Sequence, residues 1–293
     1  MTHLAYLADR GVIAVTGPDR ADFLQGLVSN DVMLAVPGRA VRAALLSPQG
    51  KWLADFFLLS DGERLLLDCE AALVPMLVPR LSRYRLRARV TVADVSAEFA
   101  VHVAWGDAAP EVGLVAADPR LPQAGWRVLA STPLPGAGDA AAWDSHRLAL
   151  GLPDGSRDLE TDKTVLLEAG FDELSGVSWS KGCYMGQELT ARTKYRGLIK
   201  RRLVPVRVEG ALPPPGTPVM RDGREVGILR SGRDGLALAT LRIEALSGVL
   251  DCGDARLTVA MPGWMRLALP DGSTDGTPDS PPGSPLAVAP AIE

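Results

Sequence analysis

The sequence contains few cysteines for its length. There are three in 293 residues, Cys69, Cys183 and Cys252, and no two of them form a CxxC pair. An odd number of widely separated cysteines argues against a disulfide framework and is usual in a reducing compartment. Because an iron–sulfur cluster usually needs four closely arranged ligands, the chain is not expected to hold such a cluster by itself.

Long apolar runs are also absent. No stretch of about eighteen apolar residues occurs, so no membrane-spanning helix is expected. The first residues, Met1 to Tyr6, lack the basic and then apolar order of a secretory signal peptide. The hydrophobic content of 47% is enough for the cores of two or three domains. We therefore expect a globular, monomeric protein of the cytoplasm that does not contact a membrane.

Basic residues are missing from the end of the chain. From Pro270 onward there are four acidic residues and no Lys or Arg, whereas the net charge of the whole chain is −4. This segment is rich in Pro, Gly, Ser and Asp, and it cannot bury enough apolar surface to offset the entropy lost on ordering. Residues 270–293 are therefore predicted to be a disordered tail.

The hydrophobic pattern predicts an α+β protein. Apolar residues at helical spacing predict helices at about 71–84 and 140–150, and Asp61-Gly62 is typical of a hairpin turn. Outside the last third, the predicted strands are 12–15, 52–59, 65–67, 85–90, 99–105, 126–130 and 176–179. From Leu203 onward, short strands separated by Gly and Pro predict a small β-barrel; they are 203–208, 225–230, 235–241 and 255–260.

One cysteine lies in a distinctive setting. Residues 181–188 read Lys-Gly-Cys-Tyr-Met-Gly-Gln-Glu and are followed by Ala191-Arg192. A cysteine between flexible glycines, beside Lys181 and before a helix predicted to begin near Tyr184, is expected to be exposed and to favour the reactive thiolate. Cys69 and Cys252 lack such a setting. The alternative interpretation is a glycine-rich turn that buries a small residue.

The octapeptide resembles the signature of the folate-binding YgfZ family, relatives of the glycine-cleavage T-protein that act in iron–sulfur protein maintenance and tRNA modification. Other matching segments follow in the same order: 17–20, 23–26, 30–31, 45–51, 147–153 and 195–202. The resemblance implies a T-protein-like fold of two interleaved α/β domains around a central folate cavity, plus a C-terminal β-barrel. The expected boundaries are 1–45 with 140–202 for the split folate-binding domain, 46–139 for the inserted domain, and 203–269 for the barrel.

The resemblance also implies a cofactor and a set of site residues. The cofactor is tetrahydrofolate or a one-carbon derivative. The residues are Cys183 and Lys181 for the chemistry, and Trp143, Glu168, Tyr184, Arg192 and Arg196 for the folate. No metal ligands are implied.

Several of these residues have simpler interpretations. Trp143 is either a cover for the flat pterin or a core residue of an amphipathic helix. Glu168 is either the acceptor for the pterin edge or a solvated acid. The basic residues between Arg192 and Arg202 suit a folate glutamate tail, RNA phosphates or solvent. Direct nucleic-acid binding is not favoured, because residues 1–269 are neutral overall and carry no RNA-binding motif.

The chain departs from the T-protein pattern at one place. The resemblance implies a catalytic aspartate soon after the strand that ends at Asp68, but no carboxylate occurs between Glu70 and Asp94. Aminomethyl transfer is therefore not expected, unless Asp68 or Glu70 substitutes after a local shift. Two function classes remain. The first is a folate-binding accessory protein for iron–sulfur client or assembly proteins, and the second is a one-carbon transferase or thiol enzyme with Cys183 as nucleophile.

Overall fold

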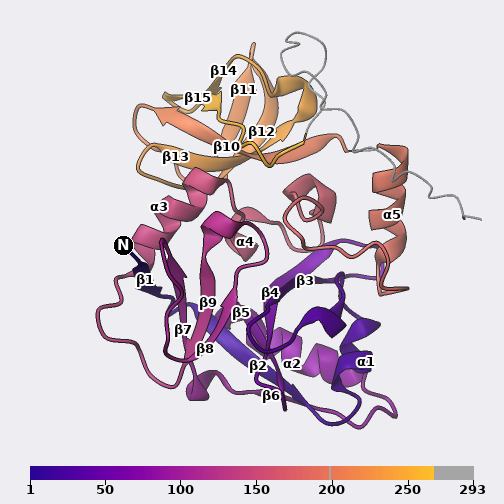
Figure 1. The fold of residues 1–293 in the computed structure, drawn as a ribbon. Helices are drawn as coiled ribbons and strands as arrows, with labels where there is room; N and C mark the ends of the chain where they lie inside the picture. The colour runs from indigo at the N-terminus through magenta and orange to yellow at the C-terminus, as the bar shows by residue number, and fades with distance from the viewer. Residues whose placement is uncertain (198, 267–293) are drawn as a thin grey trace, which may run out of the picture.

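A five-stranded antiparallel sheet forms one layer of the protein (Figure 1). Its strand order is β3-β4-β5-β2-β6, with the bounds β2 Arg10–Thr16, β3 Val41–Leu46, β4 Trp52–Ser60, β5 Leu65–Glu70 and β6 Thr91–Asp94. The predicted hairpin at Asp61-Gly62 is confirmed, since Ser60 of β4 pairs with Leu65 of β5. The structure is a computed structural model that describes residues 1–197 and 199–266, so the predicted tail at 270–293 lies outside the described residues.

A four-stranded sheet packs against this layer. Its order is β1-β7-β9-β8, with the bounds β1 His3–Tyr6, β7 Ala100–Trp105, β8 Leu114–Ala117 and β9 Trp126–Ala130. Successive side chains of β2 point to opposite faces, so Ile13 and Val15 belong to one buried cluster while Val12 and Ala14 contact the four-stranded sheet. Burial on both faces explains why β2 reads as a continuous apolar run instead of an alternation.

Helices cover the outer faces. Helices α1 (Arg20–Gln25) and α2 (Val74–Arg83) contribute Leu24 and Leu77 to the cluster of Ile13. On the far side, α3 (Ala140–Leu150) places Trp143 against the four-stranded sheet, and it has the bounds that the sequence predicted. In the described chain, no helix is long and apolar enough to cross a membrane.

The C-terminal part is a closed six-stranded barrel, as predicted (Figure 1). Its order is β10-β13-β12-β11-β14-β15, with the bounds β10 Arg201–Glu209, β11 Pro218–Arg221, β12 Arg224–Arg233, β13 Leu236–Arg242, β14 Val249–Cys252 and β15 Ala255–Val259. Strands β11 and β14 were not predicted, because strands of four residues show too little alternation to be recognised. Apolar side chains fill the interior of the barrel, for example Val206, Leu229 and Leu257.

Two predicted strands in the body of the protein are wrong. Residues 85–90 contain a turn at 86–87 and no strand, and 176–179 have no ladder partner. In each case the local pattern was compatible with a strand, but pairing with distant segments decides whether a ladder forms. The expected domain boundaries stay a prediction, although β3 pairs with β4 across 45/46.

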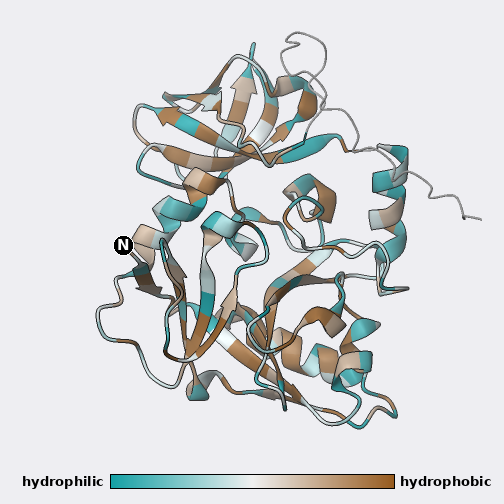
Figure 2. Cartoon of the chain, in the orientation of Figure 1, coloured by the Kyte–Doolittle hydropathy of each residue, from teal (hydrophilic) through white to brown (hydrophobic). Residues whose placement is uncertain are grey.

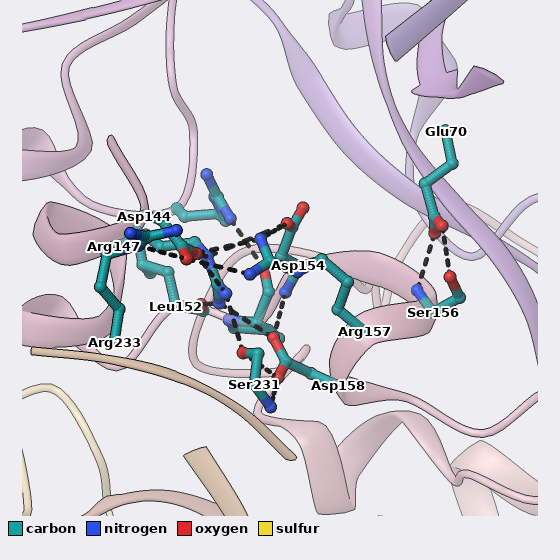
Figure 3. A network of polar contacts seen from close by, with 12 residues as sticks. Glu70, Asp144, Arg147, Leu152, Asp154, Ser156, Arg157, Asp158, Ser231 and Arg233 are labelled. Atoms are coloured by element: carbon teal, nitrogen blue, oxygen red, sulfur yellow. Dashed lines mark hydrogen bonds and ion pairs between the residues drawn. The ribbon is translucent and has the colours of Figure 1, made fainter. Parts of the chain in front are cut away.

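A buried ion-pair network joins the barrel to the body (Figure 3). Arg147 of α3 is 1% exposed; its guanidinium donates to Asp144 at 2.7 Å and to Asp158 at 2.9 Å. It also donates to the hydroxyl of Ser231 in β12 at 2.8 Å, and that hydroxyl donates to Asp158 at 2.5 Å. Asp158 ends the short helix α4 (Gly155–Asp158), so one guanidinium links α3, α4 and the barrel.

We expect Arg147→Met to lower the free energy of unfolding by about 3–5 kcal/mol, because it leaves buried carboxylates without their partner. Urea denaturation followed by circular dichroism measures this loss. Arg256→Met, at an exposed arginine on β15, is the matched control and should change stability by about 0.5 kcal/mol or less. A loss below about 1 kcal/mol for Arg147→Met would show that the network does not stabilise the fold.

Candidate functional site

The loop that carries Cys183 lies across the end of α1. The Lys181 Nζ donates to the carbonyl oxygens of Gln25 at 2.5 Å and Val28 at 2.6 Å. The Met185 amide donates to the carbonyl of Gly26 at 3.2 Å. Carbonyls at a helix C-terminus lack partners within the helix and favour a cation, so α1 is a suitable support for this loop.

A close backbone contact holds the other end of the loop. Gly186 has φ +78°, and a Cβ there would lie 2.6 Å from the Ser47 oxygen and 3.0 Å from the Gly50 Cα. Gly50 has φ +76°, and a Cβ on it would likewise lie 2.6 Å from the Gly186 oxygen. A side chain at either position would force the two segments apart. The glycines of the two motifs, 45–51 and 181–188, therefore serve one contact.

The segment before the loop is held by the turn after α1. The Ser29 hydroxyl donates to the carbonyl of Gly176 at 2.7 Å, and the Ser178 amide donates to the carbonyl of Ser29 at 3.0 Å. The Asn30 side-chain amide donates to the carbonyl of Ser175 at 2.8 Å. Ser29 and Asn30 carried no predicted role, because their partners are more than a hundred residues away in the sequence.

Cys183 is exposed, whereas Cys69 and Cys252 are buried. Gly182, before it, adopts φ +95°, and a Cβ there would meet no atom within 4 Å. Burial raises the pKa of the Cys69 thiol to about 12, and burial also raises the pKa of Cys252. The predicted exposure of Cys183 is confirmed, but helix α5 (Gln187–Arg196) begins three residues later than expected.

Lys181 is an anchor in this structure. Its ammonium is engaged by two carbonyls at the end of α1, and its Nζ lies 5.0 Å from the centre of the Tyr184 ring. Burial lowers the pKa of Lys181 to about 8, and nearby Asp31 opposes that shift. The proposed catalytic role of Lys181 stays a prediction.

Tyr184 packs into a buried hydrophobic cluster beneath the loop. Its ring is buried, and burial raises the pKa of its hydroxyl to about 12. Arg192 and Arg196, by contrast, lie exposed on α5, where Arg192 pairs with Glu188 at 3.0 Å. The structure therefore does not bring these three predicted folate residues to one cavity.

Trp143 and Glu168 lie in separate places. Trp143 is 5% exposed, and its ring centre lies 5.7 Å from those of Trp105 and His146. The cavity beside it has about 30 Å³ and is lined by charged residues that include Arg120, Arg127, Arg147 and Asp154. Glu168 borders a different cavity of about 110 Å³, where burial raises its pKa and Lys51 opposes that shift.

The cavities beside Trp143 and Glu168 do not fit a bound folate. Pockets for ligands of this size usually have about 300–1,000 Å³, which is far larger than either cavity. The Trp143 ring is already covered by other aromatic rings, and the nearby arginines are already paired with aspartates. Folate binding stays a prediction from the resemblance.

The two carboxylates considered as substitutes for a T-protein acid are both engaged. Asp68 is fully buried and accepts hydrogen bonds from Arg10 at 2.7 Å and from Arg127. Glu70 accepts from the Ser156 amide at 2.7 Å and from its hydroxyl. Both carboxylates are therefore held by hydrogen bonds within the fold.

Histidines and metal ligands do not gather at Cys183. His3 and His146 stack on Trp105, and His102 lies 3.1 Å from the Ala100 oxygen, all on the side of the four-stranded sheet. Within residues 1–197 and 199–266, no three His, Cys, Asp or Glu side chains are placed to hold a metal ion. The described part of the chain therefore offers Cys183 as a lone thiol.

Comparison with known proteins gives the family. The chain is 33% identical to mouse "Iron-sulfur cluster assembly factor IBA57, mitochondrial" over 89% of this chain and 85% of the mouse protein. The human protein of the same name is also 33% identical, over 88% of this chain and 84% of its own length. Residues 200–267 match the family described as CAF17, C-terminal beta-barrel domain. The chain belongs to the IBA57 family of iron–sulfur cluster assembly factors.

A solved structure shows the same fold. The glycine cleavage system aminomethyltransferase T from Bartonella henselae matches with a TM-score of 0.71 and 17% identity, over 89% of this chain and 85% of that one. The expected T-protein-like fold is thus confirmed, and the expected relationship holds at the level of the IBA57 family, to which YgfZ is the related bacterial family. The IBA57 relatives are named as mitochondrial, which overturns the expectation of a cytoplasmic protein. That expectation rested partly on the cysteine pattern, which does not distinguish the cytoplasm from other reducing compartments.

Native alkylation should distinguish the three thiols. We expect iodoacetamide at pH 7 to modify Cys183 in the folded protein, whereas Cys69 and Cys252 should react only after unfolding, because they are buried with raised pKa values. Mass spectrometry of proteolytic peptides, with a urea-unfolded sample as control, measures the three rates. Equal labelling of all three cysteines in the native protein would contradict the assignment.

The anchoring role of Lys181 can be tested by Lys181→Met, which keeps the length of the side chain and removes its donors. Amide hydrogen exchange should rise across 178–186, and stability should fall by about 1–3 kcal/mol, because two carbonyls lose their partner. Lys163→Met is the control, since Lys163 makes only an exposed pair with Glu160. Unchanged exchange in Lys181→Met would show that the loop is held without this residue.

Proposed function

We propose that this protein supports iron–sulfur cluster assembly by supplying the Cys183 thiolate as one ligand of a cluster that a partner protein also holds. The observation that carries the proposal is the position of Cys183. It is an exposed cysteine on a loop fixed at both ends, in a member of a family of cluster assembly factors. The cluster is the cargo of this process.

The number of ligands supports a shared cluster. Iron–sulfur clusters are usually held by four cysteine thiolates or a close variant of that set. Cys183 has no second thiol beside it, because Cys69 and Cys252 are buried in other parts of the fold. A partner must therefore contribute the remaining ligands.

The proposed role requires only one chemical step of this chain, the binding of iron by a cysteine sulfur. The Cys183 thiol loses its proton to solvent, and the thiolate sulfur forms a bond to iron. The anchors at Gln25, Val28 and Gly50 keep the loop in one place, so little conformational entropy is lost when the bond forms. Clients downstream, including cluster-dependent tRNA-modifying enzymes, would depend on this step.

Folate enters the proposal only as a prediction. Tetrahydrofolate binding follows from the resemblance and is not needed for the role of Cys183. The alternative function, a one-carbon transferase or thiol enzyme, needs a general acid or base close to the nucleophile. The histidines and the two candidate carboxylates of the described chain are engaged elsewhere, which favours the accessory role.

Complementation tests the proposal. In cells that lack their own IBA57-type factor, we expect Cys183→Ser to leave a cluster-dependent tRNA-modifying enzyme as inactive as in the empty-vector strain. Cys252→Ser should restore activity, because that thiol is buried in the barrel. Protein levels measured in both strains exclude a folding defect. Full activity with Cys183→Ser would overturn the proposed role.

A further inference from the structure

Helix α5 is an unusual element of this fold because it is polar on nearly all sides. Of its residues, only Thr190 and Thr193 are buried, and Figure 2 shows the helix mainly in the hydrophilic colour. Its inner side contacts the body through Lys194, whose Nζ lies 4.0 Å from the Trp179 ring centre and 3.1 Å from Asp172. A helix without an apolar stripe gains little stability from packing against a core. The outer side of α5 is therefore considered as a binding surface.

The outer side of α5 and the segment after it are cationic. Residues 187–201 contain five basic residues and one acid, whereas the whole chain has a net charge of −4. Arg196, Lys200 and Arg201 are exposed and form no ion pair within the described chain. Tyr195 is also exposed, beside these charges. The start of this helix is four residues from Cys183, and its basic residues gather toward its C-terminal end.

Exposed apolar residues lie in the segment that follows α1 and Asp31. Met33, Leu34 and Val36 are 39% to 49% exposed in and just after the short helix η1 (Val32–Leu34). This segment follows Asp31, whose carboxylate is close enough to Lys181 to raise its pKa. A hollow of about 500 Å³ adjoins it, lined by residues that include Leu34, Val177 and Trp179.

We infer that these features form one docking surface for an acidic protein partner, with α5 meeting its carboxylates and the Leu34–Trp179 hollow receiving an apolar side chain. This inference rests on the proposed function, since the partner would be the protein that shares the cluster with Cys183. Protein interfaces are enriched in aromatic residues, Met and Arg, and Tyr195, Met33 and Arg196 are exposed in the two segments of this surface. Charge complementarity would also speed the encounter.

A protein fits this surface better than RNA. An RNA strand would use the arginines, but it would leave the exposed Met33, Leu34 and Val36 without an apolar partner. The chain's own acidic residues, Asp271, Asp275 and Asp279, are a third occupant of suitable charge. Competition with RNA and neutralisation of these three aspartates distinguish both alternatives from a protein partner.

The probe is a short glutamate-rich peptide with one cysteine, activated as a mixed disulfide with thionitrobenzoate. The Cys183 thiolate attacks the peptide sulfur, a new disulfide forms between protein and peptide, and coloured thionitrobenzoate leaves as a thiolate. A matched peptide carries glutamine in place of glutamate. With the full chain at low salt, the glutamate peptide should react about tenfold faster or more, and the advantage should vanish at high salt.

Two triple variants locate the effect. Arg192→Gln/Arg196→Gln/Lys200→Gln should remove most of the advantage of the glutamate peptide. Arg207→Gln/Arg224→Gln/Arg256→Gln changes the net charge equally at exposed barrel positions and should keep the advantage. If wild type reacts equally with both peptides, or if the barrel variant loses as much as the α5 variant, the docking surface is wrong.

A second peptide pair tests the hollow. A glutamate peptide with a leucine next to its cysteine should react faster than the same peptide with serine, and Leu34→Ser should abolish that difference. Val249→Ser, at a residue 59% exposed on the barrel, is the control and should keep it. If the leucine peptide outpaces the serine peptide by the same factor in Leu34→Ser and in wild type, the hollow is not part of the docking surface.

Competing occupants give distinct results. A single-stranded RNA that blocks Cys183 where the glutamate peptide shows no advantage would overturn the inference in favour of nucleic acid. An advantage that emerges only in Asp271→Asn/Asp275→Asn/Asp279→Asn would overturn it in favour of the chain's own tail. These rates do not depend on complementation, so failure of the surface and failure of the proposed function are separate outcomes.

Discussion

The pairing of buried charges is the constraint on which this structure depends. Arg127 and Arg147 are almost fully buried, the first between the layers and the second between body and barrel, and each has an aspartate partner. An unpaired charge there would cost several kcal/mol, so these pairs fix the relative position of the layers. The nearby guanidinium groups outweigh the effect of burial on Asp154 and hold its pKa at about 2. These buried arginines are therefore already occupied by aspartates of the same chain.

The chain shares its fold with an enzyme, an aminomethyltransferase. The T-protein-like scaffold is retained, with a TM-score of 0.71 to the Bartonella aminomethyltransferase. The cavity beside Trp143, however, has only about 30 Å³, and Asp68 is engaged by two arginines. The exposed thiol of Cys183 lies elsewhere, on the loop that crosses the end of α1. A fold shared with an enzyme does not carry the enzyme's site with it.

The sequence allowed the elements with strong local patterns to be predicted. Helix α3, the hairpin of β4 and β5, and the barrel followed from periodicity and turn residues. The strands expected at 85–90 and 176–179 did not, because a ladder depends on partners that local alternation does not identify. The exposure of Cys183 was predictable from its glycine neighbours. The anchoring of Lys181 was not, since its acceptors, Gln25 and Val28, lie about 150 residues earlier.

The position of the loop explains how one cysteine can be sufficient. A mobile thiol would lose conformational entropy on joining a shared cluster, and this loss would weaken every complex it formed. Here the loop is already ordered by the carbonyls of Gln25, Gly26 and Val28 and by the glycine contact at Gly50. The thiol is nevertheless exposed to solvent. An ordered but exposed thiol suits the proposed role beside a partner with an incomplete ligand set, and the residues that order it come from segments far apart in the sequence.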